Sequence, residues 1–339
     1  MKAAIWKAAG AMEIGSLPKP SIDDHEVLIK VKAAGICGTD LTIYQGKFPR
    51  ERATPPMVLG HEFSGEIVEI GKSVIDYEVG DRVTADPLTS CGDCYACNNG
   101  IQHACSSLKL IGIDKNGAFA EFVKVSTDKV YRLPEALSFE EGAVIEPLAV
   151  AVHALQRARL GNDDKILIIG GGPIGILVAL VAKVTGIKKI LVSEIQDHRI
   201  DIIRKIGFDY IDASAYDIRD TFTDYFQAVG PDIVFEATGT ARGFQQAIDI
   251  TRIRGTILEV SVPKIPVELD LKRVNFAELS IVGSRVYTPD DIESAIELLP
   301  DIVDRIKNLT HVFPIEDCPD LFKKLSTGEG NLVKVILSF

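Results

Sequence analysis

Four of the six cysteines are concentrated in one short segment, and they are the clearest candidates for chemistry. Cys91, Cys94, Cys97 and Cys105 follow the spacing C-x2-C-x2-C-x7-C. Four thiolates form the closed tetrahedral ligand set of a structural Zn2+, which can pin a loop that packing alone would not hold. Iron–sulfur clusters use similar cysteine runs. We favour zinc because the segment closes a short loop in a chain that also carries the nucleotide motif described below.

A second set of ligand-type residues is dispersed along the chain. It comprises Cys37 in Gly35-Ile36-Cys37-Gly38-Thr39-Asp40, His61 and Glu62 in Gly60-His61-Glu62-Phe63, and Glu146 in Ile145-Glu146-Pro147. Cysteine, histidine and carboxylate are the ligands of a Zn2+ that keeps one position open for water or substrate. From these residues alone, a shared metal site and a separate structural role for each side chain are equally consistent with the sequence.

A glycine-rich segment follows an apolar run and opens an apolar helical stretch. Residues 166–169 are followed by a G-x-G-x-x-G match that contains Gly170, Gly172, Pro173, Ile174 and Gly175. The three glycines allow a tight turn, the approach of a pyrophosphate and close packing of the helix on the strand. The helix N-terminus would then face the anion. This context predicts a dinucleotide site.

An acidic residue after the second strand indicates which dinucleotide binds. Glu194 lies 24 residues after Gly170, near the ~20 expected for the carboxylate that holds the adenosine ribose diol. Its charge would repel a 2′-phosphate, which favours NAD over NADP. Arg199 can also reach a phosphate and weighs against this preference.

The apolar pattern changes near the middle of the chain. Residues 1–135 contain short apolar segments between Gly, Pro and Asp, which is typical of antiparallel β structure with irregular loops. From about residue 149, apolar segments at 166–169, 190–192, 233–235 and 257–260 alternate with helical stretches, which predicts a doubly wound α/β sheet. A helix over 290–299 and a strand over 331–337 follow. We therefore expect one domain from residues 1–148 and 288–339, and a nucleotide-binding domain from residues 149–287.

The composition excludes several classes of protein. With 339 residues, 46% hydrophobic and 25% charged, the chain suits two ordinary globular domains. A net charge of −11 and the lack of a dense Lys/Arg run oppose binding to nucleic acid. No apolar run reaches the ~20 residues needed to cross a bilayer, and no secretory signal is evident at the N-terminus. We therefore expect no membrane association and a cytoplasmic protein with reduced thiols.

Together these motifs resemble those of the zinc-containing medium-chain dehydrogenases, most closely the sorbitol, L-threonine and butanediol dehydrogenase branch. The similarity covers nearly the whole chain and rests on segments 35–40, 60–65, 80–83, 91–105, 146–148 and 170–175. It implies a GroES-like antiparallel β catalytic domain joined to a Rossmann domain. It also implies an enzyme that transfers hydride between NAD and a secondary alcohol of a small polyol, as sorbitol dehydrogenases do.

The resemblance assigns roles to the dispersed residues. Cys37, His61 and a carboxylate from Glu62 or Glu146 would hold a catalytic zinc, so that each subunit binds two zinc ions. Glu146 stands where many alcohol dehydrogenases have a second cysteine ligand, which favours the polyol branch. Zinc in such a site lowers the pKa of the bound alcohol, and hydride then passes to the cofactor.

Residues beside the ligands are implied to orient them and to move a proton. Asp40 would fix the tautomer of His61, and Thr39 would carry the substrate proton away. L-threonine dehydrogenases have a histidine at the position of Thr42. This departure weakens an L-threonine assignment and leaves the onward proton path open.

The remaining expectations also follow from the resemblance. Thr238, Val260 and Ser261 would border the cofactor, and Arg285 would face the substrate. The alternative functions are an L-threonine 3-dehydrogenase, a 2,3-butanediol-type diol dehydrogenase and a catalytically silent NAD-binding protein. Family members are dimers or tetramers, so we expect a homo-oligomer, with a tetramer favoured and subunit contacts near 256–264 and Gly283.

Overall fold

The computed structural model describes residues 1–263 and 265–339, so Lys264, at the end of one predicted subunit contact, lies outside the described residues. The chain divides into two compact units. The β unit contains Met1–Glu146, Thr288–Pro300 and Thr310–Phe339. The α/β unit contains Pro147–Tyr287 and Asp301–Leu309. Each is described by itself below.

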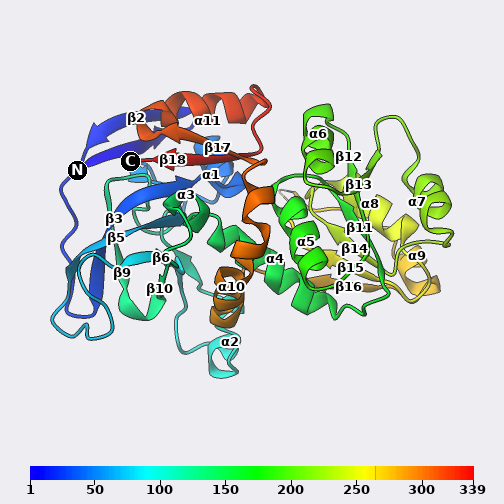
Figure 1. Ribbon diagram of the computed structural model, residues 1–339, viewed down its shortest axis with the longest axis horizontal. Coiled ribbons are helices and arrows are strands. Elements are labelled where there is room, and N and C mark those ends of the chain that lie inside the picture. The colour runs from blue at the N-terminus through cyan, green and yellow to red at the C-terminus, as the bar shows by residue number, and fades with distance from the viewer. Residues whose placement is uncertain (264) are drawn as a thin grey trace. The chain divides into compact units, whose positions relative to one another are not determined.

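The β unit is built from short, mostly antiparallel strands (Figure 1). One sheet has the order β2-β1-β4, from Ala11–Ser16, Lys2–Ala8 and Met57–Val58. The main sheet has the order β10-β6-β5-β3-β18-β17, from Val130–Arg132, Arg82–Ala85, Glu62–Ile70, Glu26–Gly35, Lys334–Ser338 and Thr310–Pro314, and β9 (Phe122–Ser126) also pairs with β3. A small sheet pairs β7 (Leu88–Thr89) with β8 (Lys109–Leu110).

Three adjacent strands of the main sheet position the dispersed ligand-type residues. β3 pairs antiparallel with β5, so that Gly35 lies opposite Glu62. On its other side β3 pairs antiparallel with β18, so that Gly35 lies opposite Ile336. The end of β3 and the beginnings of β5 and β18 therefore meet at the same edge, although they come from distant parts of the sequence.

The helices of the β unit are short apart from those near its C-terminal part. They are α1 (Gly38–Tyr44), α2 (Tyr95–Asn98), α3 (Phe139–Gly142), α11 (Cys318–Thr327) and the first part of α10 (Pro289–Ile306), whose residues from Asp301 onward belong to the α/β unit. α11 packs on β2, and its Phe322 joins the main buried cluster with Phe119 and Tyr44.

The α/β unit contains a parallel sheet with the order β13-β12-β11-β14-β15-β16. Its strands are Asp209–Asp212, Lys189–Glu194, Lys165–Ile169, Ile233–Glu236, Thr256–Glu259 and Ser280–Gly283. The connecting helices are α5 (Pro173–Val184), α6 (Asp197–Lys205), α7 (Ile218–Phe226), α8 (Ala241–Ile250) and α9 (Leu271–Phe276), and α4 (Ile145–Ala158) precedes the sheet. In Figure 1, α5 and α6 lie on one side of the strands and α7, α8 and α9 on the other.

This sheet confirms the predicted doubly wound arrangement. All four predicted strands are present and pair in parallel. Strands β13 and β16 and helices α7 and α9 were not predicted, because their segments are short or lack a clear apolar period. The helix predicted over 290–299 continues to Ile306, with Pro300 inside it, and the last strand begins at Lys334 rather than at residue 331.

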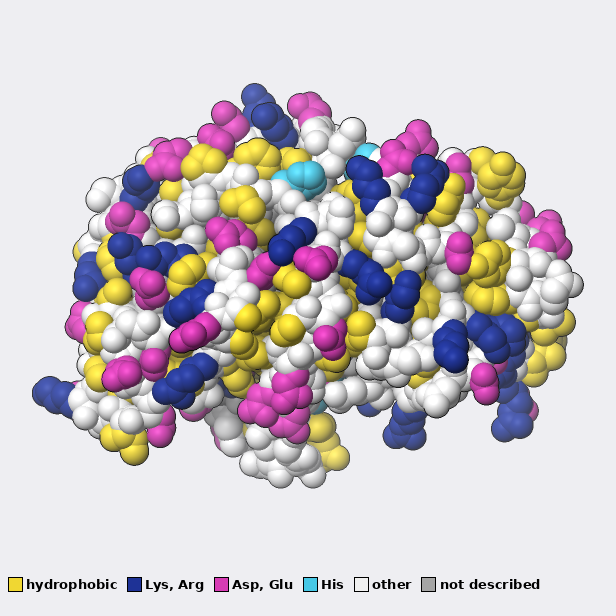
Figure 2. All heavy atoms as spheres, in the orientation of Figure 1, with side chains coloured by type: hydrophobic (Ala, Val, Ile, Leu, Met, Phe, Trp, Pro, Cys, Tyr) yellow, Lys and Arg dark blue, Asp and Glu magenta, His cyan; other side chains and the backbone are white. Residues whose placement is uncertain are grey.

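The surface carries charges of both signs. On the face drawn in Figure 2, lysine and arginine side chains are interspersed with aspartate and glutamate. Within the described ranges, the helices are too short or too polar to cross a membrane.

Candidate metal and nucleotide sites

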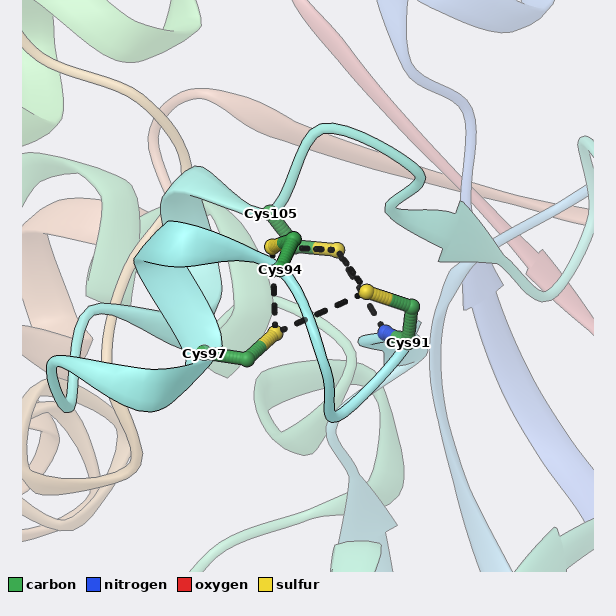
Figure 3. Close-up of side chains that lie close together, drawn as sticks. All are labelled: Cys91, Cys94, Cys97 and Cys105. Atoms are coloured by element: carbon green, nitrogen blue, oxygen red, sulfur yellow. Dashed lines mark hydrogen bonds between the residues drawn. The ribbon is translucent and has the colours of Figure 1, made fainter.

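The connection between β7 and β8 carries the four clustered cysteines. Cys97 lies in the short helix α2, and Cys105 ends a single 3-10 turn. The four side chains point toward one another (Figure 3), and none is in a disulfide. This connection has almost no regular structure of its own, so something other than packing must hold it together.

The sulfur positions fit a single tetrahedral ion. The Sγ–Sγ distances are 3.4 Å for Cys91–Cys105, 3.5 Å for Cys94–Cys97, 3.8 Å for Cys94–Cys105 and 3.9 Å for Cys91–Cys97. Four ligands at a Zn–S distance of ~2.3 Å in tetrahedral geometry lie about 3.8 Å apart. An iron–sulfur cluster distributes its cysteines over several irons and needs a wider arrangement. The spacing therefore favours zinc over a cluster.

The surrounding backbone favours thiolates. The N–H groups of Cys97 and Ser106 lower the pKa of Cys94 to about 5. The N–H of Cys91 also lowers the pKa of Cys105. In contrast, a hydrogen bond to Asp93 raises the pKa of Cys91 to about 12. A divalent cation would compensate the negative charge that these sulfurs share.

The first three dispersed ligand-type residues come together at the edge of the main sheet. Ligand atoms of Cys37, His61 and Glu62 all lie within 4.8 Å of one another. Cys37 directly precedes α1, while Glu62 begins β5 and His61 directly precedes that strand. A thiolate, an imidazole and a carboxylate match the donor set of a catalytic zinc. The residues present therefore fit the metal that the sequence predicts.

Asp40 connects two members of this cluster. Its Oδ2 accepts a hydrogen bond of 2.9 Å from the backbone N–H of Cys37, and its Oδ1 lies 3.5 Å from Nδ1 of His61. Burial disfavours the charged imidazole, but Asp40 and Cys37 raise the pKa of His61 well above its ordinary value. Asp40 therefore lies beside His61, and its orienting role stays a prediction.

Lys334, at the start of β18, lies beside this cluster and was not predicted from the sequence. Its Nζ forms a buried ion pair with Glu62, and it lies 3.3 Å from the carbonyl oxygen of Ile36. Burial opposes its charge, but Glu62, Cys37 and Glu146 raise the pKa of Lys334. In the sequence, the only indication of a special role for Lys334 was its position as a charged residue within the apolar run 332–337.

The remaining predicted residues near the metal cluster are placed as follows. Glu146 is buried in the first turn of α4, and it is not in the group formed by Cys37, His61 and Glu62. Thr39 is half-buried in α1, and its backbone N–H lies 3.5 Å from Sγ of Cys37. The hydroxyl of Thr42 donates to the carbonyl oxygen of Gly38 at 3.0 Å.

The glycine segment in the α/β unit has the geometry of a phosphate-binding turn. Gly170 has φ = +105°, and Pro173 occupies the first turn of α5. A Cβ on Gly175 would lie 1.9 Å from the carbonyl oxygen of Gly170, so only glycine allows this approach of helix to strand. The N–H groups at the start of α5 are therefore brought to the end of β11.

Glu194 lies at the end of β12 beside this turn. Its Oε2 accepts a 2.9 Å hydrogen bond from the N–H of Gly171, and Oε1 accepts one of 2.7 Å from the N–H of Ile195. Nη1 of Arg199 lies 3.5 Å from the same carboxylate. The acid and the arginine are thus neighbours.

Three further predicted residues of the α/β unit follow strand ends. Thr238 follows β14, while Val260 and Ser261 follow β15. A buried carboxylate, Glu236, links these turns, and the sequence analysis assigned it no role. Arg285 is exposed after β16.

Comparisons with known proteins agree with both units. Residues 23–135 match the family model of the alcohol dehydrogenase GroES-like domain, and residues 173–301 match that of zinc-binding dehydrogenases. The chain is 34% identical over 334 residues to a sorbitol dehydrogenase of Halalkalibacterium halodurans, covering 97% of this chain and 96% of that protein. It is 34% identical over 339 residues to an L-threonine 3-dehydrogenase of Rhizobium etli, covering 98% and 97%.

A solved structure shares the whole fold. A zinc-binding dehydrogenase of Sinorhizobium meliloti 1021, bound to NADP, superimposes with a TM-score of 0.91 at 30% identity, covering 100% of this chain and 99% of that chain. The predicted combination of a GroES-like domain with a Rossmann domain is confirmed. The chain belongs to the zinc-containing medium-chain alcohol and polyol dehydrogenase family and is an enzyme of that class.

Proposed function

We propose that this enzyme transfers hydride between NAD and a secondary hydroxyl of a small polyol, with a zinc ion at the edge of the main sheet. The observation that carries the proposal is the convergence of Cys37, His61 and Glu62 within 4.8 Å. A zinc held there would lower the pKa of the substrate alcohol. The sorbitol dehydrogenase relative supports a polyol as the substrate class.

The chain's own residues supply the ligands and the proton path. Cys37 and His61 would bind the metal, and Asp40, whose Oδ1 lies 3.5 Å from Nδ1 of His61, would fix the orientation of that ring. Thr39 lies two residues after Cys37, and its hydroxyl would relay the substrate proton by accepting it while passing its own proton on toward solvent. Because residue 42 is a threonine, whose hydroxyl donates to the carbonyl oxygen of Gly38, the proton would leave by a route that uses no histidine at this position.

We assign the third metal ligand to Glu62 and a second, exchangeable position to Glu146. The carboxylate of Glu62 is already in the cluster, but Lys334 competes with the metal for it. Zinc affinity tests this assignment, because Glu62→Gln should weaken zinc binding more than Glu146→Gln does. The reverse order would assign the ligand to Glu146.

For the cofactor we propose NAD, because Glu194 lies beside the glycine turn, where it would repel a 2′-phosphate. Arg199 would contact the cofactor from the same side. The relative with bound NADP makes the opposite preference the alternative to test. We also propose a second, structural zinc at the four cysteines, giving two per chain.

The finer assignments remain part of the proposal. Arg285 would face the substrate, and the subunits would form a tetramer in the cytoplasm. The exposed apolar side chains of Val262, Ile265 and Ile281 near β16 support a subunit contact there. An L-threonine 3-dehydrogenase is the second candidate, because a relative of that name is equally identical.

The test is the initial rate of NADH formation from NAD+ with polyols, short diols, simple secondary alcohols and L-threonine, repeated with NADP+. The proposal expects the highest kcat/KM with a polyol and NAD+. A preference for L-threonine or for NADP+ would show which of the two assignments is wrong. NAD binding without turnover of any alcohol would revive the catalytically silent alternative.

A further inference from the structure

Glu236 is a fully buried carboxylate at the end of β14, in the α/β unit. Within the described part of the chain it forms no ion pair with a lysine or arginine. A buried carboxylate without a cation is costly unless hydrogen-bond donors surround it. Glu236 is surrounded by donors, and they come from two different turns.

Each oxygen of the carboxylate accepts two hydrogen bonds. Oε1 accepts from the backbone N–H of Thr238 at 2.9 Å and from its hydroxyl. Oε2 accepts from the N–H of Gly239 at 3.0 Å and from the hydroxyl of Ser261 at 2.5 Å. Thr238 and Gly239 follow β14, whereas Ser261 follows β15. One side chain therefore joins two turns at the carboxyl ends of neighbouring strands.

The surrounding packing leaves little room for another arrangement. A Cβ on Gly243, in the first turn of α8, would lie 2.4 Å from Oε1 of Glu236 and 2.3 Å from the Thr238 hydroxyl. A Cβ on Gly170 would lie 2.8 Å from Cγ2 of Thr238. The turn that Glu236 holds thus touches the glycine turn of the nucleotide site directly.

The sheet order indicates which half of the cofactor these turns serve. A dinucleotide lies across the carboxyl ends of the strands at the point where the strand order reverses, here between β11 and β14. Glu194 after β12 serves the adenosine side. The turns after β14 and β15 lie on the opposite side of β11 and therefore border the other half of the cofactor.

We propose that Glu236 is a positioning residue that locks the turn after β14 to the turn after β15 and so shapes the nicotinamide half of the cofactor site. This inference rests on the proposed use of NAD. Because a carboxylate only accepts hydrogen bonds, all four donors are satisfied at once. In Glu236→Gln, the amide nitrogen would face either the pair of donors on Thr238 or the pair from Gly239 and Ser261. A hydroxyl can rotate to accept from the amide, but the backbone N–H of Thr238 or Gly239 would lose its acceptor, which would loosen the link between the two turns.

The experiment compares the dissociation constants of NADH and AMP for the wild type, Glu236→Gln and a control, Glu259→Gln. Glu259 lies opposite Glu236 in the register of β15, so the control removes a nearby charge while leaving the four hydrogen bonds in place. We expect Glu236→Gln to weaken NADH about tenfold, equivalent to roughly 1.4 kcal/mol. AMP, which lacks the nicotinamide half, should change by less than about twofold.

Amide hydrogen exchange provides a readout that does not depend on the ligand. Exchange at 237–240 and 260–262 should increase in Glu236→Gln but not in Glu259→Gln. If Glu236→Gln does not fold, Glu236→Asp keeps the charge but is too short to reach both turns, and it should show the same changes to a smaller degree.

Equal weakening of NADH and AMP, or unchanged NADH affinity in a folded variant, would overturn the inference. Wild-type protein that binds AMP but not NADH would refute the proposed cofactor and the inference with it. If the wild-type protein binds NADH, the proposed use of NAD stands, whatever the variants do.

Discussion

Replacing Lys334 by methionine should strongly destabilise the β unit in metal-free protein. The side chains of Lys334 and Glu62 are only 3% and 2% exposed. In their ion pair, each side chain compensates the charge of the other. Removing one partner of a buried pair leaves the other charge uncompensated, which costs about 3–5 kcal/mol. We therefore expect the free energy of unfolding to fall by that amount.

The assay is urea unfolding followed by the fluorescence of Trp6, the only tryptophan, which is buried in the β unit. Lys32→Met is the matched control. Lys32 pairs with Glu66 across β3 and β5 at 2.8 Å, but the two side chains are 28% and 37% exposed. Loss of this partly exposed pair should cost less than about 1 kcal/mol.

The double variant Lys334→Met with Glu62→Gln should recover most of the lost stability, because neither member of this ion pair is left as an uncompensated charge. Two results would refute the reasoning. One is a cost for Lys334→Met no larger than for Lys32→Met. The other is a double variant as unstable as the single one, which would mean that packing rather than charge sets the cost.

Four further outcomes follow. Cys97→Ser should reduce bound zinc by one ion per chain in metal analysis, and unchanged metal content would exclude the four-cysteine site. Glu194→Ala should raise the ratio of kcat/KM for NADP+ to that for NAD+ by about tenfold or more, and an unchanged ratio would remove Glu194 from cofactor selection. Thr39→Val should lower kcat about 100-fold with NADH affinity unchanged, whereas weaker NADH binding at normal kcat would contradict a proton-transfer role. Burial raises the pKa of Asp232, but hydrogen bonds, including one from Arg252, outweigh burial and lower it. The ionised carboxylate therefore stabilises the fold at any pH above its unfolded pKa of about 4, and this contribution is lost as the pH falls from about 4 through the lower folded pKa. Asp232→Asn should accordingly lose its full amount of stability at pH 7 and less below about pH 4, and a loss that does not change with pH would contradict this.

The sequence predicted the parts of the fold that depend on long, regular patterns. The alternation of apolar strands and helices between 166 and 260 was sufficient to identify the doubly wound sheet, because buried parallel strands are apolar over their whole length. Strand β16 carries exposed residues and lies at the edge of the sheet, so its pattern is weak. Pro300 inside α10 would normally end a helix, and the local sequence does not indicate that this one continues.

The site residues could likewise be predicted only where the sequence itself places them close together. The four cysteines are close in sequence, so their spacing alone predicted a shared ion. Cys37 and His61 needed the resemblance to a family, because only the pairing of β3 with β5 brings them together. Lys334 is 272 residues from Glu62, and no local pattern predicts an ion pair over that distance. Glu236 directly follows the apolar segment 233–235 but was given no role, because its four donors belong to turns whose geometry depends on the folded sheet.

The most direct test of the central claim is the rate of NADH formation from NAD+ and a polyol before metal removal, after removal with a chelator, and after zinc is returned. The account predicts that turnover is lost with the metal and restored by zinc. In Cys37→Ser, added zinc should not restore turnover. Turnover that persists without metal, or a zinc-loaded protein that oxidises no alcohol, would contradict it.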